Sequence, residues 1–163
     1  MNAKAAASSA IIAGLRSVGN CMKDDEDIKR IVHYFKGRDE VSALYMFGGY
    51  AKGRKTGESD IDVGILVDES RSKGRNFEFF KKKYYAASPA FSMRPVDIVI
   101  LNTAPPFLKH QVLKTGKVLF DRNKKLRVRF TTTAIIEYLD YKPIQDTYLK
   151  ALSKRIRRTA VGR

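Results

Sequence analysis

The chain has very little cysteine and histidine. Its 163 residues include one cysteine, Cys21, and two histidines. A single cysteine cannot close an internal disulfide, and two histidines cannot build a zinc site from imidazole alone. A disulfide-stapled domain and an imidazole zinc site are therefore excluded.

Long apolar runs are also missing. No run approaches the roughly 20 apolar residues that a membrane-crossing helix needs. The segment Met1 to Ser17 has no acid and a short apolar stretch, but serines interrupt it. We therefore expect residues 1–23 to form a flexible or helical lead rather than a secretion signal. The expected protein is cytoplasmic and makes no membrane contact.

Acidic residues are scarce relative to basic ones. The chain has 32 lysines and arginines against 17 acids, a formal net charge of +15. This charge favours an acidic protein partner, nucleic acid or both. No RRM, KH or zinc-type RNA-binding motif is present, so we expect only nonspecific RNA contact through the basic surface. The basic segment 153–163 is predicted to be a disordered tail.

The segment from Met46 to Asp62 combines glycines with two closely spaced acids. It lies between two short apolar runs, 41–47 and 61–67, each typical of a buried strand. Asp60 and Asp62 are two residues apart, so on a strand both would project to one face. Two such carboxylates are costly unless a divalent cation lies between them, and Mg²⁺ is usually held by one or two carboxylates plus substrate phosphates. The spacing predicts a metal site that can accept a nucleotide.

Glycines and basic residues supply the expected phosphate-binding part of this site. Glycines directly after the first strand can take φ > 0 and bring backbone N–H groups close to an anion. A later glycine lets the backbone approach the anion at a second point, and the lysine and arginine residues around it add positive charge. The predicted nucleotide-binding residues are Gly48, Gly49, Lys52, Gly53, Arg54 and Ser59.

This pattern resembles that of the nucleotidyltransferase superfamily related to DNA polymerase β. The superfamily pattern is Gly-Ser, ten residues, then Asp-x-Asp. Here Gly48 and Gly49 take the Gly-Ser positions, ten residues follow, and Asp60-Ile61-Asp62 completes the pattern. The chain is most similar to small stand-alone members, the minimal nucleotidyltransferase (MNT or MntA) antitoxins that are paired with HEPN-domain toxins. The resemblance covers about residues 25 to 150.

The resemblance implies a third carboxylate on a later strand and a defined reaction. Asp97 is the candidate, because it is the single acid in an apolar, β-branched run at 94–101. Asp60, Asp62 and Asp97 are then implied as catalytic ligands of two Mg²⁺ ions. The implied reaction transfers AMP from ATP to a tyrosine hydroxyl of a cognate HEPN ribonuclease toxin and so silences it.

Gly49 departs from the superfamily pattern, which has serine there. Glycine keeps the backbone donor and loses the hydroxyl, so nucleotide binding is expected to weaken by about 1.5–3 kcal/mol. Tyr50 is a candidate to compensate by stacking or hydrogen bonding.

Two other functions fit the same residues. One is a nucleotidyltransferase that acts on a small molecule or an RNA end. The other is a non-catalytic antitoxin that neutralises its partner by binding, which the Gly49 departure favours.

The expected fold is α/β, a mixed sheet flanked by helices with a polymerase β-like core and a helical C-terminal arm. The domain is expected to span 24–152. Beyond the strands at 41–47, 61–67 and around Asp97, a short strand is expected at 117–120. Helices are expected at 24–36, 72–87, 106–115 and 134–141, the last one capped by a threonine from 131–133 and separated by Pro143 from a further helix at 144–156.

Overall fold

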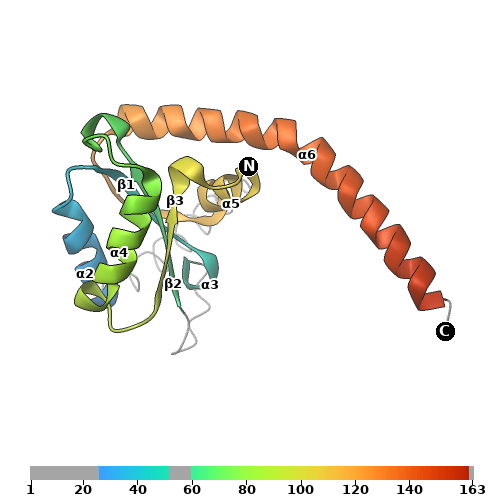
Figure 1. The fold of residues 1–163 in the computed structure, drawn as a ribbon, viewed down its shortest axis with the longest axis horizontal. Coiled ribbons are helices and arrows are strands. Elements are labelled where there is room, and N and C mark those ends of the chain that lie inside the picture. The colour runs from blue at the N-terminus through green and yellow to red at the C-terminus, as the bar shows by residue number, and fades with distance from the viewer. Residues whose placement is uncertain (1–25, 52–59, 162–163) are drawn as a thin grey trace, which may run out of the picture.

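The computed structural model describes residues 26–51 and 60–161, with side chains described as far as 157. Figure 1 shows a twisted sheet with helices on both sides and one long helix that leaves the body of the molecule. The elements are α2 (Glu26–Lys36), β1 (Val41–Phe47), α3 (Gly48–Ala51), β2 (Ile61–Val67), η1 (Glu69–Arg71), α4 (Phe77–Phe91), β3 (Val96–Ile100), η2 (Leu101–Thr103), α5 (Pro106–Thr115), β4 (Lys117–Asp121) and α6 (Lys124–Val161).

The sheet is mixed and four-stranded, in the order β3-β2-β1-β4. β1 pairs antiparallel with β2 and β4, whereas β2 and β3 are parallel and joined through α4. All seven residues of β1 are buried, as expected for a central strand covered on both faces. The prediction of a mixed sheet flanked by helices is confirmed, and β1 and β2 have the predicted bounds.

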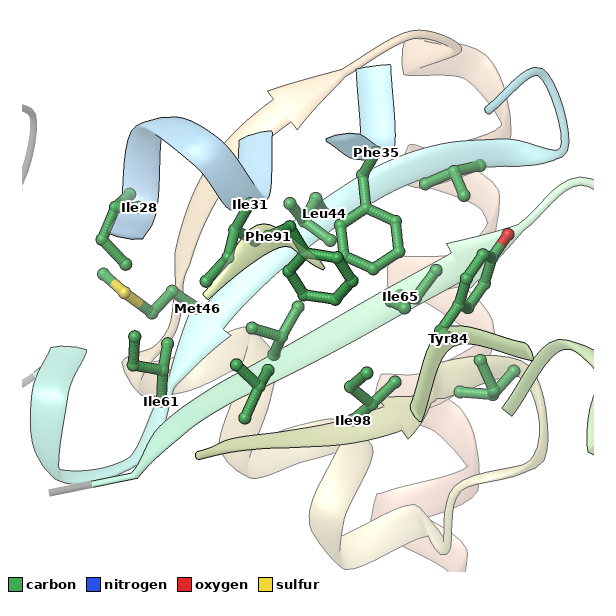
Figure 2. Packing of buried hydrophobic residues seen from close by; sticks show 14 of the residues in the cluster. Ile28, Ile31, Phe35, Leu44, Met46, Ile61, Ile65, Tyr84, Phe91 and Ile98 are labelled. Carbon is green, nitrogen blue, oxygen red and sulfur yellow. The ribbon is translucent and has the colours of Figure 1, made fainter. Parts of the chain in front are cut away.

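Two apolar layers cover the two faces of the sheet. Ile28, Ile31 and Phe35 recur at helical spacing and turn one side of α2 toward the sheet. Figure 2 shows these side chains with Tyr84 and Phe91 of α4 above the strands. On the other face, Val112 of α5 and the half-buried Leu126 and Phe130 of α6 pack against β1 and β2 side chains. The candidate site lies on this second face of the sheet, which α5 and α6 cover.

Helix α4 begins five residues later than predicted. Lys73 and Gly74 have φ of 53° and 71°, values that an α-helix does not allow. Asn76 then caps the helix, because its side-chain oxygen accepts the Phe79 N–H at 2.8 Å. The segment 72–76 is therefore a turn. Gly37 follows the end of α2 without the left-handed conformation typical of a glycine cap.

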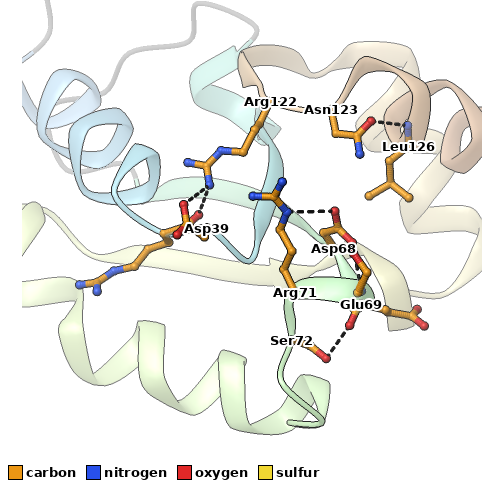
Figure 3. Close-up of polar contacts among 10 residues, drawn as sticks. Asp39, Asp68, Glu69, Arg71, Ser72, Arg122, Asn123 and Leu126 are labelled. Carbon is orange, nitrogen blue, oxygen red and sulfur yellow. Dashed lines mark hydrogen bonds and ion pairs between the residues drawn. The ribbon is translucent and has the colours of Figure 1, made fainter.

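Helix α6 is one continuous element, where the sequence predicts two helices. Asn123 provides the cap by accepting the Leu126 N–H at 3.1 Å, as shown in Figure 3. Thr131 lies inside the helix and bonds the Arg127 carbonyl at 2.9 Å, so the threonine caps were wrong. Pro143 is accommodated within the helix, which bends part-way along in Figure 1. The helix also includes residues 153–161, expected as a disordered tail.

Arg122 secures the junction between β4 and α6. Its guanidinium donates to Asp39 Oδ1 at 3.0 Å and to the carbonyl oxygens of Arg38 and Lys36 at 2.9 and 2.6 Å. Figure 3 shows the Asp39 contact. Arginine can bind several oxygens at once because its five N–H groups form a rigid fork. None of the helices in the described ranges has the length and apolarity that crossing a bilayer would require.

An ion pair ties together three segments around the start of β3. The Arg94 Nε donates to Asp27 Oδ2 of α2 at 2.7 Å, and its Nη2 donates to the Tyr50 hydroxyl of α3 at 3.2 Å. The Met93 N–H also donates to Asp27, at 3.1 Å. Asp27 is only 9% exposed, so its charge depends on these donors. Arg94 thus fixes α3 and β3, the two elements that carry Gly48 and Asp97.

Replacing Arg94 with alanine is expected to lower the free energy of unfolding by about 2–3 kcal/mol, because it removes a guanidinium that pairs with the largely buried Asp27 carboxylate. Urea denaturation measures the loss. The matched control is the Asp27→Ala, Arg94→Ala double variant, which removes both charges and should be more stable than Arg94→Ala alone. A double variant that loses the sum of both single effects would contradict this account of the pair.

Candidate functional site

Strands β2 and β3 place two of the predicted aspartates beside each other. Asp62 and Asp97 are register partners in the parallel pair. Asp60 immediately precedes β2, two residues before Asp62, and therefore belongs to the same face. Neighbouring β2 residues such as Ile61 and Val63 point into the α2 and α4 layer. The carboxylates consequently lie on the opposite face, at the end of the sheet where β2 begins.

The three carboxylates are close enough for their charges to interact. Burial raises the pKa of Asp62, and the negative charges of Asp97 and Asp60 raise it further. Asp62 is half-buried, whereas Asp60 and Asp97 are exposed at the rim. The site therefore holds an excess of negative charge that a bound cation would relieve.

Gly48 lies directly against the Asp62 carboxylate. It is the first residue of α3 and has φ +72°. A Cβ at this position would lie 1.8 Å from Asp62 Oδ2, far inside van der Waals contact. Gly49 has ordinary φ, is exposed and has nothing within 4 Å of an added Cβ. Only the first of the two glycines is required by the local packing.

Tyr85 is a site residue that the sequence did not indicate. Its hydroxyl donates to Asp97 Oδ1 and accepts the Ile98 N–H at 3.1 Å. β3 is an edge strand, so this tyrosine on α4 satisfies a backbone donor on the sheet's outer edge and also holds the Asp97 side chain. Burial and the bond to Asp97 raise the pKa of Tyr85. No spacing rule connects a helix residue to a strand twelve residues later.

Tyr50 does not have the role suggested from sequence. Its side chain is 1% exposed, and the Arg94 guanidinium lies 4.9 Å from its ring centroid. A buried ring in this position cannot stack on a nucleotide, so the stacking suggested as compensation for Gly49 was wrong. The other predicted nucleotide-binding residues, Lys52, Gly53, Arg54 and Ser59, lie outside the described residues and stay predictions.

The residues present fit Mg²⁺ by their chemistry. In the described ranges, no three acidic, histidine or cysteine side chains are already gathered as a metal-binding cluster. The oxygens of Asp60, Asp62 and Asp97 are nonetheless the hard ligands that Mg²⁺ prefers. The pKa of Asp62 is raised by burial first and then by the negative charges of Asp97 and Asp60, which a bound cation would offset. Mg²⁺ needs only one or two carboxylates when substrate phosphates complete its shell.

Comparison with known proteins identifies the family. Residues 29–125 match the model for "Polymerase beta, Nucleotidyltransferase", which covers more than half of the chain. The chain therefore belongs to the polymerase β nucleotidyltransferase family. The match includes Gly48, Asp60, Asp62 and Asp97.

Two relatives indicate which branch of the family is similar. The protein adenylyltransferase MntA of Shewanella oneidensis is 30% identical over 81 residues, which are 50% of this chain and 55% of that protein. A putative protein adenylyltransferase of Methanocaldococcus jannaschii is 38% identical over 53 residues, 30% of this chain and 53% of that protein. The chain thus spans about half the length of the curated relatives it matches.

Solved structures share the fold. A toxin–antitoxin complex with AMP-PNP gives a TM-score of 0.59 at 23% identity, covering 77% of this chain and 98% of that chain. An MNT antitoxin bound to the tri-AMPylated HEPN toxin of Shewanella oneidensis gives 0.61 at 18% identity, covering 78% and 96%. At these identities the likeness shows the polymerase β-like nucleotidyltransferase fold alone.

Proposed function

We propose that this protein is a Mg²⁺-dependent antitoxin that transfers AMP from ATP to a tyrosine hydroxyl of a HEPN-domain ribonuclease toxin. The observation that carries the proposal is the register pairing of Asp62 with Asp97 beside Gly48, in a chain of the polymerase β family. The relatives support the acceptor and the nucleotide, because solved neighbours include an AMPylated HEPN toxin with its antitoxin and a complex with AMP-PNP.

The chain's own residues would bind and orient the reactants. Asp60, Asp62 and Asp97 would hold Mg²⁺, which when bound supplies charge neutralisation at the phosphates and lowers the pKa of the acceptor hydroxyl. Gly48 leaves room for the Asp62 carboxylate next to the backbone of α3. Tyr85 fixes the rotation of the Asp97 carboxylate through Oδ1.

The proposed reaction is an in-line displacement without a covalent enzyme intermediate. The acceptor oxygen attacks the α-phosphorus, the bond to the bridging oxygen breaks, and pyrophosphate leaves. The hydroxyl proton is released to water. Catalysis then consists of positioning and electrostatic stabilisation, so no protein nucleophile is needed.

An assay with α-labelled ATP, Mg²⁺ and the purified toxin tests the proposal. The label should enter the toxin with the wild-type protein and should be absent when Asp60 and Asp62 are both replaced by alanine. Equal labelling by the two proteins would reject the site. Labelling of an RNA end or a small molecule, with none on the toxin, would reject the acceptor.

The glycine at position 49 supports a second candidate function, that of an antitoxin that acts by binding alone. The position lacks the hydroxyl that the family pattern supplies for nucleotide binding. If this candidate is right, the Asp60→Ala, Asp62→Ala protein should protect cells from the toxin as well as the wild type does. Under the adenylyltransferase proposal, protection requires both aspartates.

Restoring serine at position 49 is expected to tighten ATP binding about 10-fold, because a hydroxyl that bonds a charged phosphate contributes at least about 1.5 kcal/mol. Gly49→Ala is the matched control, since the open surroundings also accept its methyl group. Isothermal titration with ATP and Mg²⁺ measures both. Equal affinities for the serine and alanine variants would show that the hydroxyl makes no contact with the nucleotide.

A further inference from the structure

The inner half of α6 uses one apolar stripe to pack on the domain. Leu126 and Phe130 pack against the second core layer, and Ala134 is 1% exposed. Tyr138 stacks on His110 of α5, with ring centroids 3.8 Å apart and planes 5° from parallel. These residues recur every four positions, which keeps them on one helix face.

The same face continues apolar beyond the body of the domain. We call this continuation the outer stripe. It consists of Tyr141, Ile144, Tyr148 and Leu152, which follow one another at spacings of three, four and four residues and begin three residues after Tyr138. Their exposed fractions are high: Tyr141 38%, Ile144 68%, Tyr148 65% and Leu152 38%. Figure 1 shows this half of α6 projecting away from the sheet and the other helices. An apolar row of this kind on an exposed helix marks an interaction surface.

Charge defines what can cover the outer stripe. Between residues 147 and 157 the helix has four basic residues and no acid: Lys150, Lys154, Arg155 and Arg157. The two acids of this half precede them, and one, Asp146, is paired with Lys142. A second copy of a chain with net charge +15 would be repelled, so the complementary partner is acidic.

The composition of the stripe fits a protein better than a bilayer. Two of its four members are tyrosines, which are enriched at protein interfaces because they combine a large apolar area with a hydrogen-bonding end. From residue 139 onward α6 has no tryptophan and no phenylalanine, which helices lying in a membrane surface commonly use as anchors.

We propose that residues 141–157 of α6 form a docking arm for an acidic protein, which binds to the apolar outer stripe. This inference rests on the proposed function, in which that partner is the HEPN-domain toxin that accepts AMP. α6 covers the sheet face on which Asp62 lies, so the arm continues from the site's own side of the sheet. The arm supplies affinity and leaves the chemistry to the aspartates.

The test compares two variants that add the same charge to the arm, one within the outer stripe and one outside it. Ile144→Glu, Tyr148→Glu changes the outer stripe, and Thr147→Glu, Ser153→Glu changes exposed positions that do not belong to the stripe. All four positions are exposed, so both variants should keep the wild-type circular dichroism and melting temperature. Titration calorimetry measures affinity for the purified HEPN-domain toxin, and labelled ATP reports AMP transfer at low toxin concentration.

The stripe variant is expected to bind the toxin at least about 100-fold more weakly, with AMP transfer reduced in parallel, because a few buried aromatic and aliphatic anchors carry most of an interface's affinity. The control variant should bind within a few-fold of wild type. Transfer by the stripe variant should recover at high toxin concentration, since the aspartates are intact.

Several outcomes would overturn the docking arm. Unchanged toxin affinity in the stripe variant would do so while leaving the proposed function intact. A wild-type dimer that the stripe variant converts to a monomer, or stripe-dependent binding to anionic vesicles, would each show that the stripe binds something other than the toxin. Stripe-dependent toxin binding without any AMP transfer would support the arm and reject the proposed function.

Discussion

Replacing Asp62 with asparagine is expected to lower the rate of AMP transfer by about 10³-fold or more. Asp62 is the central carboxylate of the proposed metal site, where a bound cation would contribute several kcal/mol of transition-state stabilisation, and each 1.4 kcal/mol is a factor of ten. The measurement is the initial rate of label transfer from ATP to the toxin. Glu78→Gln, an equal charge change on the exposed first turn of α4, should leave the rate unchanged.

The same substitution is expected to stabilise the protein when divalent cations are absent. Burial, Asp97 and Asp60 raise the pKa of Asp62 above 3.8, so the ionised carboxylate is less favourable in the folded state than in the unfolded state. That contribution to stability is present at low pH and is lost as the pH rises through the raised pKa. Asparagine stays neutral, so the variant does not lose this stability as the pH rises.

The melting temperatures of wild type and Asp62→Asn should therefore coincide near pH 4 and differ by about 2–4 °C at pH 7, the shift that 1 kcal/mol gives a domain of this size. The shift is small because solvent screens a half-buried group. Adding Mg²⁺ with ATP should raise the melting temperature of wild type more than that of the variant. A variant less stable than wild type at pH 7 without metal would contradict this account of the site.

Replacing Gly48 with alanine is expected to lower AMP transfer by at least about 100-fold, because the new Cβ cannot coexist with Asp62 Oδ2 in its present position. The carboxylate or the start of α3 must move, and misplacement by about 1 Å typically costs a factor of this size. The left-handed φ also costs about 1–2 kcal/mol for a residue with a Cβ. Rate measurements and urea denaturation should both report a loss.

The adjacent glycine provides the control for Gly48. Gly49→Ala adds the same methyl group one residue later, where φ is ordinary and the surroundings are open. It should change the transfer rate by no more than a few-fold. Equal losses in the two variants would show that α3 as a whole tolerates no side chain, and that the close approach to Asp62 is not the cause.

The sequence predicted strands β1 and β2 and the common face of Asp60 and Asp62 well, because both depend on local patterns. β1 and β2 are short apolar runs bounded by polar and glycine residues, and their predicted bounds were right. The i, i+2 spacing fixed the shared face of Asp60 and Asp62. That Asp97 would lie beside Asp62 followed from the resemblance to the family, and the strand register supports it.

The errors fall where tertiary contacts or backbone conformation override local preference. Thr131 and Pro143 normally indicate a helix cap and a helix break, but Asn123 already caps α6, and Pro143 lies inside one continuous helix. Tyr50 is buried in the core, where its hydroxyl accepts a hydrogen bond from Arg94, 44 residues away in sequence. Tyr85 reaches Asp97 across the edge of the sheet, a contact set by how α4 packs on β3.

The most direct test of the central claim is the mass of the HEPN-domain toxin after incubation with this protein, ATP and Mg²⁺. We predict that the intact mass rises by whole AMP units, that peptide mapping places them on tyrosine, and that the Asp60→Ala, Asp62→Ala protein produces no increase. An unmodified toxin whose ribonuclease is inhibited equally by both proteins would contradict the claim and identify a binding antitoxin instead.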